Sequence, residues 1–201
     1  TTAPISLSNV TVGVGGITFA NVSTTGGASG INIDNVGQVG GSTGIDINGG
    51  SIANKTSRGV DINAVSADVS IAASISSTAA GRTVEVTNSG RNVAGGSQIV
   101  FSGAIDENGL GINLDNNDQN TNGAVITFSG GLDIDSAGSN SGFVATNGGT
   151  VVVTGPNNTI VTTSGTALNV ANTTIGASGL NFAGISASGA TNGIVLNNTG
   201  S

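Results

Sequence analysis

The stretch Gly165–Asn198 has the sequence GTALNVANTTIGASGLNFAGISASGATNGIVLNN. It contains three short apolar pieces and the start of a fourth, namely Leu168/Val170, Leu180/Phe182, Ile185 and Ile194/Leu196. Apolar residues alternate with polar ones within the pieces, and Gly or Asn follows or precedes them. Because the side chains of a strand point alternately to its two faces, this pattern predicts three short β-strands per cycle with tight turns between them.

The same cycle recurs along the whole chain with a period of about 27 residues. The first piece follows the pattern apolar, any, apolar, any, Asn and begins at Ile5, Ile31, Val84, Ile112, Phe143, Leu168 and Ile194, with a shortened copy at Val60. A second series begins at Ile17, Ile45, Val69, Ile99, Ile126, Val151 and Leu180. A weaker third series contains Val22, Ile52, Ile75, Ile105, Leu132 with Ile134, Ile160 and Ile185. Such a repeat predicts an all-β parallel β-helix of about seven coils with three short strands per coil.

Gly and Asn occupy fixed places in the cycle. Gly stands just before the first strand at Gly30, Gly59, Gly111, Gly142 and Gly193, where we expect a corner with positive φ. Asn at the far end of that strand tolerates the left-handed region, and its amide can bond to the Asn one coil away. We therefore expect a ladder of Asn side chains along one corner, with a row of amides that binds a ligand as the alternative.

Four of the five Phe residues fall at the end of second-series pieces: Phe19, Phe101, Phe128 and Phe182. We expect them to form one inward ladder with Ile47, Ile71 and Val153, because stacked rings bury area that small residues cannot. An exposed aromatic row that stacks on sugars is the alternative.

Composition limits the possible functions. The chain has 201 residues with 35 Gly and no Cys, His, Trp, Tyr or Met. Its net charge of −7 makes binding to nucleic acid or to an anionic membrane unfavourable. No apolar run approaches the roughly 20 residues of a membrane helix, and no signal peptide is recognisable. The chain starts at Thr1 without Met, which indicates a processed protein or a segment, and the lack of Cys is compatible with an extracellular location.

The runs TALNVANTTIGASGLNFAGISA and GIVLNNTG resemble the repeats of giant bacterial surface and secreted proteins, such as autotransporter passengers and filamentous-haemagglutinin-like adhesins. The resemblance covers most of the chain in style, and 145–198 most closely. It implies a right-handed coil and a role in adhesion, biofilm or cell-surface structure. It also implies an extracellular or cell-surface location.

Without His or Cys, the usual catalytic triads and zinc sites cannot form, so the candidate chemistry rests on carboxylates. Asp61 and Glu85 should be outward neighbours in successive coils, with Asp34 and Asp115 further along the same face. They predict a solvated acidic stripe, or alternatively a weak Ca²⁺ site. The basic residues Lys55, Arg58, Arg82 and Arg91 are expected to pair with Asp61, Asp68 or Glu85.

Three pairs could supply two carboxylates for cleavage of a polysaccharide, namely Asp106/Glu107, Asp133/Asp135 and Asp115/Asp118. Nothing else in the sequence supports an enzyme, so we assign no catalytic, cofactor or metal residues. The Ca²⁺-binding nonapeptide repeat is not matched by 40–47 or by 130–134. An ice-binding Thr row is not supported either, because the second series places only Thr18 and Thr127 among Asp46, Ser70, Val100, Val152 and Asn181.

We therefore predict a single domain over residues 1–201, a segment of a longer repetitive protein. Its expected function is an extracellular structural or adhesive stalk without catalysis. The alternatives are a self-assembling fibre subunit and a β-helix that binds or cleaves polysaccharide. The expected partners are neighbouring repeats or identical subunits at the open ends, together with surface glycans.

Overall fold

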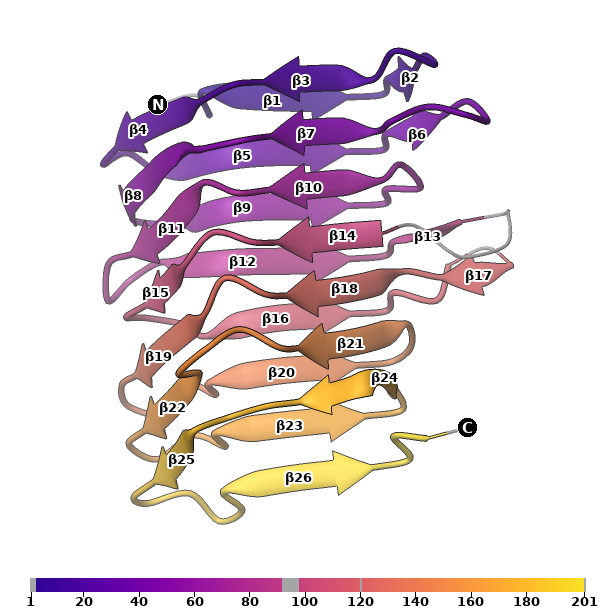
Figure 1. Ribbon diagram of the computed structural model, residues 1–201. Coiled ribbons are helices and arrows are strands. Elements are labelled where there is room, and N and C mark those ends of the chain that lie inside the picture. The colour runs from indigo at the N-terminus through magenta and orange to yellow at the C-terminus, as the bar shows by residue number, and fades with distance from the viewer. Residues whose placement is uncertain (1–2, 92–97, 120, 201) are drawn as a thin grey trace.

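The computed structural model describes residues 3–91, 98–119 and 121–200, and Figure 1 shows them as a stack of coils. The chain forms a parallel β-solenoid of about seven turns with about 26 residues per turn and three strands per coil. The described residues contain no helix. Each coil adds one strand to each of three sheets, as the sequence predicts.

Three sheets run the length of the solenoid. Sheet 1 consists of β1 (Ile5–Ser8), β5 (Ser29–Asp34), β9 (Arg58–Asn63), β12 (Arg82–Thr87), β16 (Ile112–Asp115), β20 (Phe143–Thr146), β23 (Leu168–Ala171) and β26 (Ile194–Asn197). Sheet 2 consists of β3 (Ile17–Phe19), β7 (Ile45–Ile47), β10 (Val69–Ile71), β14 (Gln98–Phe101), β18 (Val125–Phe128), β21 (Thr150–Val153) and β24 (Thr174–Leu180). Sheet 3 consists of β4 (Val22–Thr25), β8 (Gly50–Lys55), β11 (Ser74–Ser77), β15 (Ile105–Glu107), β19 (Leu132–Ser136), β22 (Thr159–Thr162) and β25 (Gly184–Ala187).

Two short ladders extend one corner. In the first, β2 (Thr11–Val12) pairs in parallel with β6 (Gly37–Gln38). In the second, β13 (Gly90–Arg91) pairs antiparallel with β17 (Asn122–Gly123). In Figure 1 the strands of sheet 1 lie behind and run to the right, while those of sheet 2 lie in front and run to the left as the coils descend. This is the path of a right-handed coil, as expected.

Strand registers confirm the first series and correct parts of the other two. Along sheet 1, Ile5 pairs with Ile31 and Ile31 with Val60, and such rows fill the core to the last coil. The third series predicts that Val22 stacks on Ile52, but Thr24 pairs with Ile52. Strand β8 begins two residues before Ile52, and its first residue, Gly50, is the partner of Val22.

Phe182 is not a member of the Phe ladder, and Asn181 is not in the outward row of sheet 2. The register between β21 and β24 shifts, so that Val151 pairs with Ile175 and Val153 with Leu180. The extra residues of β24 bring Leu180 to the position predicted for Phe182, which lies beyond the strand. The ring of Phe182 instead packs edge to face on Phe143 of sheet 1, with centroids 6.1 Å apart.

The other rings also cross between sheets. Phe101 and Phe128 stack in sheet 2 at 5.0 Å, as predicted, and Phe128 then packs edge to face on Phe143 at 5.5 Å. Phe19 is half-buried in the first coil. The aromatic cluster therefore ties sheets 1 and 2 together across the narrow core.

The Asn corner is confirmed. The residue after the first strand has φ between 51° and 58° in every coil: Asn9, Asn35, Ala64, Asn88, Asn116, Asn147, Asn172 and Asn198. Asn35 Nδ2 donates to Asn9 Oδ1 at 2.7 Å, and Asn198 Nδ2 donates to Asn172 Oδ1 at 3.1 Å. In the coil with Ala64, the preceding Asn63 substitutes, because its Oδ1 accepts from Asn88 Nδ2 at 2.8 Å.

The Gly residues before the first strand lie where the sequence predicts, but a positive φ is not the reason for most of them. Of the five, only Gly111 has a positive φ, of 77°. A Cβ atom on Gly59 would lie 2.6 Å from Ile75 Cγ2 and 2.6 Å from the carbonyl oxygen of Thr83. Gly30 and Gly142 face Ile52 and Ile160 in the same way. Close approach of sheet 1 to sheet 3 is what excludes a side chain at these three positions.

We expect Gly59→Ala to lower the free energy of unfolding by about 1–3 kcal/mol, because overpacking must move Ile75 or the neighbouring backbone. Gly184→Ala is the matched control, since a Cβ atom there meets nothing within 4 Å and its φ is not positive. Urea denaturation followed by circular dichroism measures both. Equal midpoints for the two variants would contradict the close-approach explanation.

Candidate functional site

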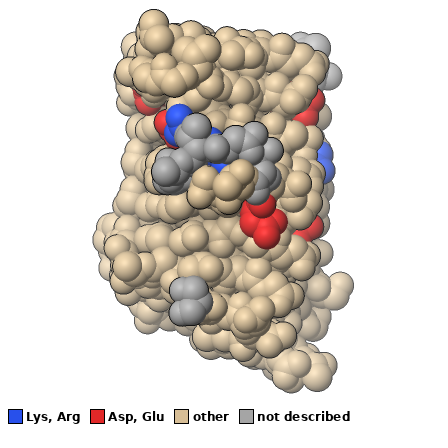
Figure 2. All heavy atoms as spheres, turned by 90° about the vertical axis from the view of Figure 1, so that its right-hand side faces the viewer, with Lys and Arg blue, Asp and Glu red and all other residues tan. Residues whose placement is uncertain are grey.

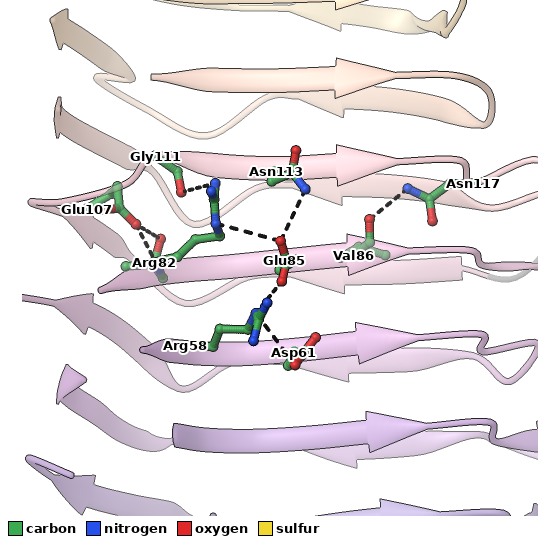
Figure 3. Close-up of polar contacts among 10 residues, drawn as sticks. Arg58, Asp61, Arg82, Glu85, Val86, Glu107, Gly111, Asn113 and Asn117 are labelled. Carbon is green, nitrogen blue, oxygen red and sulfur yellow. Dashed lines mark hydrogen bonds and ion pairs between the residues drawn. The ribbon is translucent and has the colours of Figure 1, made fainter. Parts of the chain in front are cut away.

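Charged side chains gather on the middle coils, as the face in Figure 2 shows. In Figure 3, Arg58, Arg82 and Glu85 form one cluster on the outer face of sheet 1. Arg58 Nε donates to Glu85 Oε2 and lies 3.6 Å from Asp61 Oδ2, and Arg82 Nε lies 3.8 Å from Glu85 Oε1. Asn113 Nδ2 completes the cluster by donating to Glu85 at 3.2 Å. The cluster therefore links three successive coils, through β9, β12 and β16.

This cluster changes the predicted acidic stripe. Asp61 and Glu85 are neighbours in register, as expected, but Arg58 and Arg82 compensate their charges. Burial raises the pKa of Asp61, an effect that the nearby Arg58 opposes, and burial lowers the pKa of Arg82. A cation at this position would compete with two guanidinium groups. The described part of the chain contains no group of three or more acidic side chains arranged to hold a metal ion.

Asp34 and Asp115 belong to the Asn corner. Asp34 Oδ1 accepts from Asn63 Nδ2 at 2.8 Å, and Asp115 Oδ1 accepts from Thr146 Oγ1 at 2.7 Å and from Asn147 Nδ2 at 2.8 Å. Each carboxylate thus accepts a hydrogen bond from an Asn side chain of the next coil and joins two successive coils at this corner.

Arg91 pairs with Asp68 as predicted, at 3.1 Å, but the prediction for Lys55 is wrong. Lys55 is 1% exposed, and its Nζ donates to Thr24 Oγ1 at 2.8 Å and to the carbonyl of Gly26. Burial lowers the pKa of Lys55. Its place at the end of β8 turns the side chain into the core, away from the acids on the outer face of sheet 1.

Glu107 is a second buried charged residue, with 0% exposure. In β15 the side chains alternate, so Glu107 points inward while Asp106 points outward. Glu107 Oε1 accepts from Ser77 Oγ at 3.0 Å and from the Gly109 amide at 2.7 Å. Its Oε2 accepts from the Thr83 hydroxyl at 2.8 Å and from the Thr83 amide. All lone pairs are engaged away from solvent, so this carboxylate cannot serve a bound substrate as acid or base.

Lys55, Ser77 and Glu107 form what we call the polar seam, a run of inward positions along sheet 3. Lys55 pairs in register with Ser77, and Glu107 with Ile134. Beyond Glu107 the same row is apolar and contains Ile134 and Ile160. The sequence suggests Asp106 and Glu107 as two carboxylates for cleavage of a polysaccharide, but the structure turns them to opposite faces of β15. The alternation of Ile105, Asp106 and Glu107 already contained the signal that separates them.

The remaining acids gather on the outer face of sheet 3. Asp106 pairs in register with Asp133, and Asp135 follows Asp133 on the same face of β19. Burial, and then the charges of Asp133 and Asp106, raise the pKa of Asp135. Thr159 Oγ1 donates to Asp133 at 2.8 Å. The structure thus groups Asp133/Asp135 with Asp106.

Asp118 lies at a different corner from these acids. It lines a polar cavity of about 340 Å³ together with Gly148, Thr173 and Asn198. Its predicted partner Asp115 is bound within the Asn corner, so the pair Asp115/Asp118 is not arranged as two free carboxylates.

No protein-family model matches this chain, and neither the curated proteins nor the solved structures yield a match. The described residues include no helix that is long and apolar enough to span a membrane. The fold is therefore established by the coil geometry alone, and the likeness to adhesin repeats remains a resemblance in sequence style.

Glu107→Gln should lower the free energy of unfolding by about 3 kcal/mol, because one amide group cannot accept bonds from all four donors. Urea denaturation measures this loss.

The double variant Thr83→Gly/Glu107→Ile should be more stable than the sum of its single variants predicts, by about 1–3 kcal/mol. It reproduces the pair Gly142 and Ile160, which occupies the same two rows in a later coil. A double-mutant cycle in urea tests this coupling, and strict additivity would contradict it.

Asp135→Asn should stabilise the fold at pH 7. The folded-state pKa of Asp135 is raised above its unfolded value, so its favourable contribution exists at low pH and is lost as pH rises through the folded pKa. The gain from Asn should therefore fall to nearly zero at pH 3. Thermal melts at both pH values measure the difference, with Asp118→Asn as a carboxylate removed at a distant corner. A gain that is equal at both pH values would contradict the assignment.

Proposed function

We propose that this chain is a rigid extracellular rod, a stalk or spacer with an adhesive polar surface in a bacterial surface protein. The observation that carries the proposal is the unbroken register of sheet 1 through eight strands. A parallel stack adds one strand spacing per coil, so seven spacings of about 4.8 Å give a rod of roughly 34 Å. Its length is fixed by the number of coils.

Rigidity is supported by the contacts between coils. Buried Val, Ile, Leu and Phe side chains form one hydrophobic cluster that extends along the rod from Ile5 to Val170. The Asn corner and the Arg58–Glu85 cluster add side-chain bonds parallel to the rod axis. Bending the rod would break several of these contacts in one place, because each coil contacts only its neighbours.

The outer surface offers binding groups that are distributed over several coils instead of gathered in one pocket. The outward row of sheet 1 is polar except at Val144 and Val195, and it consists of Ser6, Asn32, Asp61, Glu85, Asn113, Val144, Asn169 and Val195. These polar side chains repeat at one strand spacing, which suits weak hydrogen bonds to a repetitive partner such as a surface glycan. The extracellular location follows from the resemblance to adhesin repeats and accords with the absence of Cys.

One experiment tests both the rod and its location. Ser6 and Val195 lie in the same outward row of sheet 1, seven spacings apart. Because the chain has no native Cys, Ser6→Cys/Val195→Cys can be labelled selectively with a membrane-impermeant spin label on intact cells of the organism that encodes it. We expect full labelling without lysis and one narrow distance distribution near 34 Å, broadened by the label linkers.

The control variant Ser6→Cys/Asn113→Cys spans four spacings in the same row and should give a distance about four-sevenths as long. Labelling only after lysis would refute the extracellular location. A broad distribution in the purified, labelled chain would refute the rigid rod.

A further inference from the structure

The Asn corner has a gap in one coil. Of the eight residues that follow the strands of sheet 1, seven are Asn and one is Ala64. Ala64 keeps the left-handed backbone of this row, with a φ of 53°. Its methyl group cannot join the side-chain ladder, so the coil of β9 lacks the amide that the other coils place here. Strands β5 and β12 flank β9 on its two sides, so the gap lies inside the stack.

Asn63 carries the ladder past this gap, but one residue earlier in the chain. Its Nδ2 donates to Asp34 Oδ1 and its Oδ1 accepts from Asn88 Nδ2, each at 2.8 Å. In the part of the chain that the structure describes, no group donates to Asn35 Oδ1, and none accepts the second hydrogen of Asn88 Nδ2. The gap therefore has a spare acceptor in the coil before it and a spare donor in the coil after it.

A groove of about 550 Å³ lies at this gap, where β5, β9 and β12 end on the right in Figure 1. Its volume falls within the range of small-molecule sites, about 300–1,000 Å³. The groove is lined by uncharged residues, namely Asn35, Asn63, Ala64, Ser66, Asn88 and Gln119. Among the described residues, the Ser66 hydroxyl and Gln119 Oε1 have no hydrogen-bond partner. The groove therefore suits a neutral ligand that carries several polar groups.

The missing side chain defines the chemistry of the ligand. In this row an Asn amide donates N–H to the coil before it, as Asn35 does to Asn9, and its carbonyl accepts from the coil after it, as Asn172 does from Asn198. An acetamido group carries the same N–H and C=O. The coils of Asn35 and Asn88 are two strand spacings apart, about 9.6 Å, which is too far for one hydroxyl group to bond to both residues.

We propose that the groove at Ala64 binds the acetamido group of an N-acetylated sugar. The N–H of the sugar donates to Asn35 Oδ1, and its carbonyl accepts from Asn88 Nδ2, in place of the missing side chain. Hydroxyl groups of the sugar ring bond to Ser66 and Gln119. A neutral sugar also suits a chain with a net charge of −7, which repels anionic ligands. The inference rests on the proposed adhesive function and adds one defined site to the outer face of sheet 1.

A matched pair of disaccharides tests the class of ligand. N,N′-diacetylchitobiose and cellobiose share one sugar backbone, and the former has an acetamido group where the latter has a hydroxyl group on each ring. Each is titrated into the isotope-labelled protein, and NMR follows the side-chain amide signals of Asn35 and Asn88. We expect N,N′-diacetylchitobiose to shift both signals with a Kd on the order of 1 mM, because the groove is open and offers few hydrogen bonds. Cellobiose should bind at least about tenfold more weakly.

Ala64→Asn tests the place of binding, because the new side chain fills the gap. The affinity for N,N′-diacetylchitobiose should fall at least about tenfold. The urea midpoint should rise, because the new amide joins the ladder and Asn tolerates a φ of 53° better than Ala does. A loss of binding in a more stable protein cannot come from unfolding. The control Ala79→Asn, in an exposed turn at the opposite end of sheet 1, should leave the affinity unchanged.

Ser66→Ala leaves the ladder intact and should lower the affinity about threefold, through the loss of one hydroxyl contact. The proposal is overturned if cellobiose binds as tightly as N,N′-diacetylchitobiose, or if Ala64→Asn binds like the unchanged chain. It is also overturned if neither disaccharide shifts the two signals at about 10 mM. Shifts confined to Asn32 and Asn113 would overturn the groove but support the distributed contact on the outer face of sheet 1. Failure of the groove and failure of the proposed function are therefore distinguishable.

Discussion

Every feature of this protein depends on one constraint, the stacking of each residue on its counterpart one strand spacing away. In a parallel stack the backbone of each coil bonds to the coil above and below, so a position has the same neighbours for the length of the rod. Side-chain chemistry is then organised in rows. An inward side chain packs against the side chains before and after it in its own row and against the facing row of another sheet. Its size and polarity need to match only these neighbours.

The polar seam shows what this constraint permits. Glu107 occupies a row that holds Ile134 and Ile160 in later coils. Its buried charge is accommodated because Thr83 stands where most other coils have Gly. No hydrogen bond or ion pair joins Lys55 to Glu107, since Ser77 separates them in the row. Each is satisfied locally by hydroxyl and backbone groups. An exchange of apolar for polar packing can thus be confined to two or three coils without altering the coils beyond them.

The same locality explains what the sequence could reveal. Alternation and period gave the three sheets, the Asn corner and most registers, because these are properties of rows. The errors fall where one coil departs from the rest. The shifted register of β24 displaces Phe182, and the extended β8 places Thr24 instead of Val22 opposite Ile52. The sequence predicts the position of Gly59 correctly but not its reason, because the contact with Ile75 depends on how sheet 1 packs on sheet 3. The pairing expected for Lys55 and the pair Asp106/Glu107 are wrong because a charged residue need not be exposed: Lys55 is buried at the end of β8, and alternation in β15 buries Glu107.

The charged side chains lie in the coils between Asp34 and Asp135, so the middle coils and the end coils are held together by different contacts. In the middle coils, Arg58, Arg82 and Glu85 form ion pairs on the outer face of sheet 1 that join successive coils, and solvent weakens the pair of Arg58, whose side chain is 43% exposed. The end coils, which have no charged side chains, rely on apolar rows and on amides whose bonds point in one direction. An uncharged amide can exchange water for another amide with little desolvation cost, whereas a carboxylate at the same edge would resist burial. The amide ladder therefore joins successive coils at this corner in the charged middle of the rod and in its uncharged end coils alike.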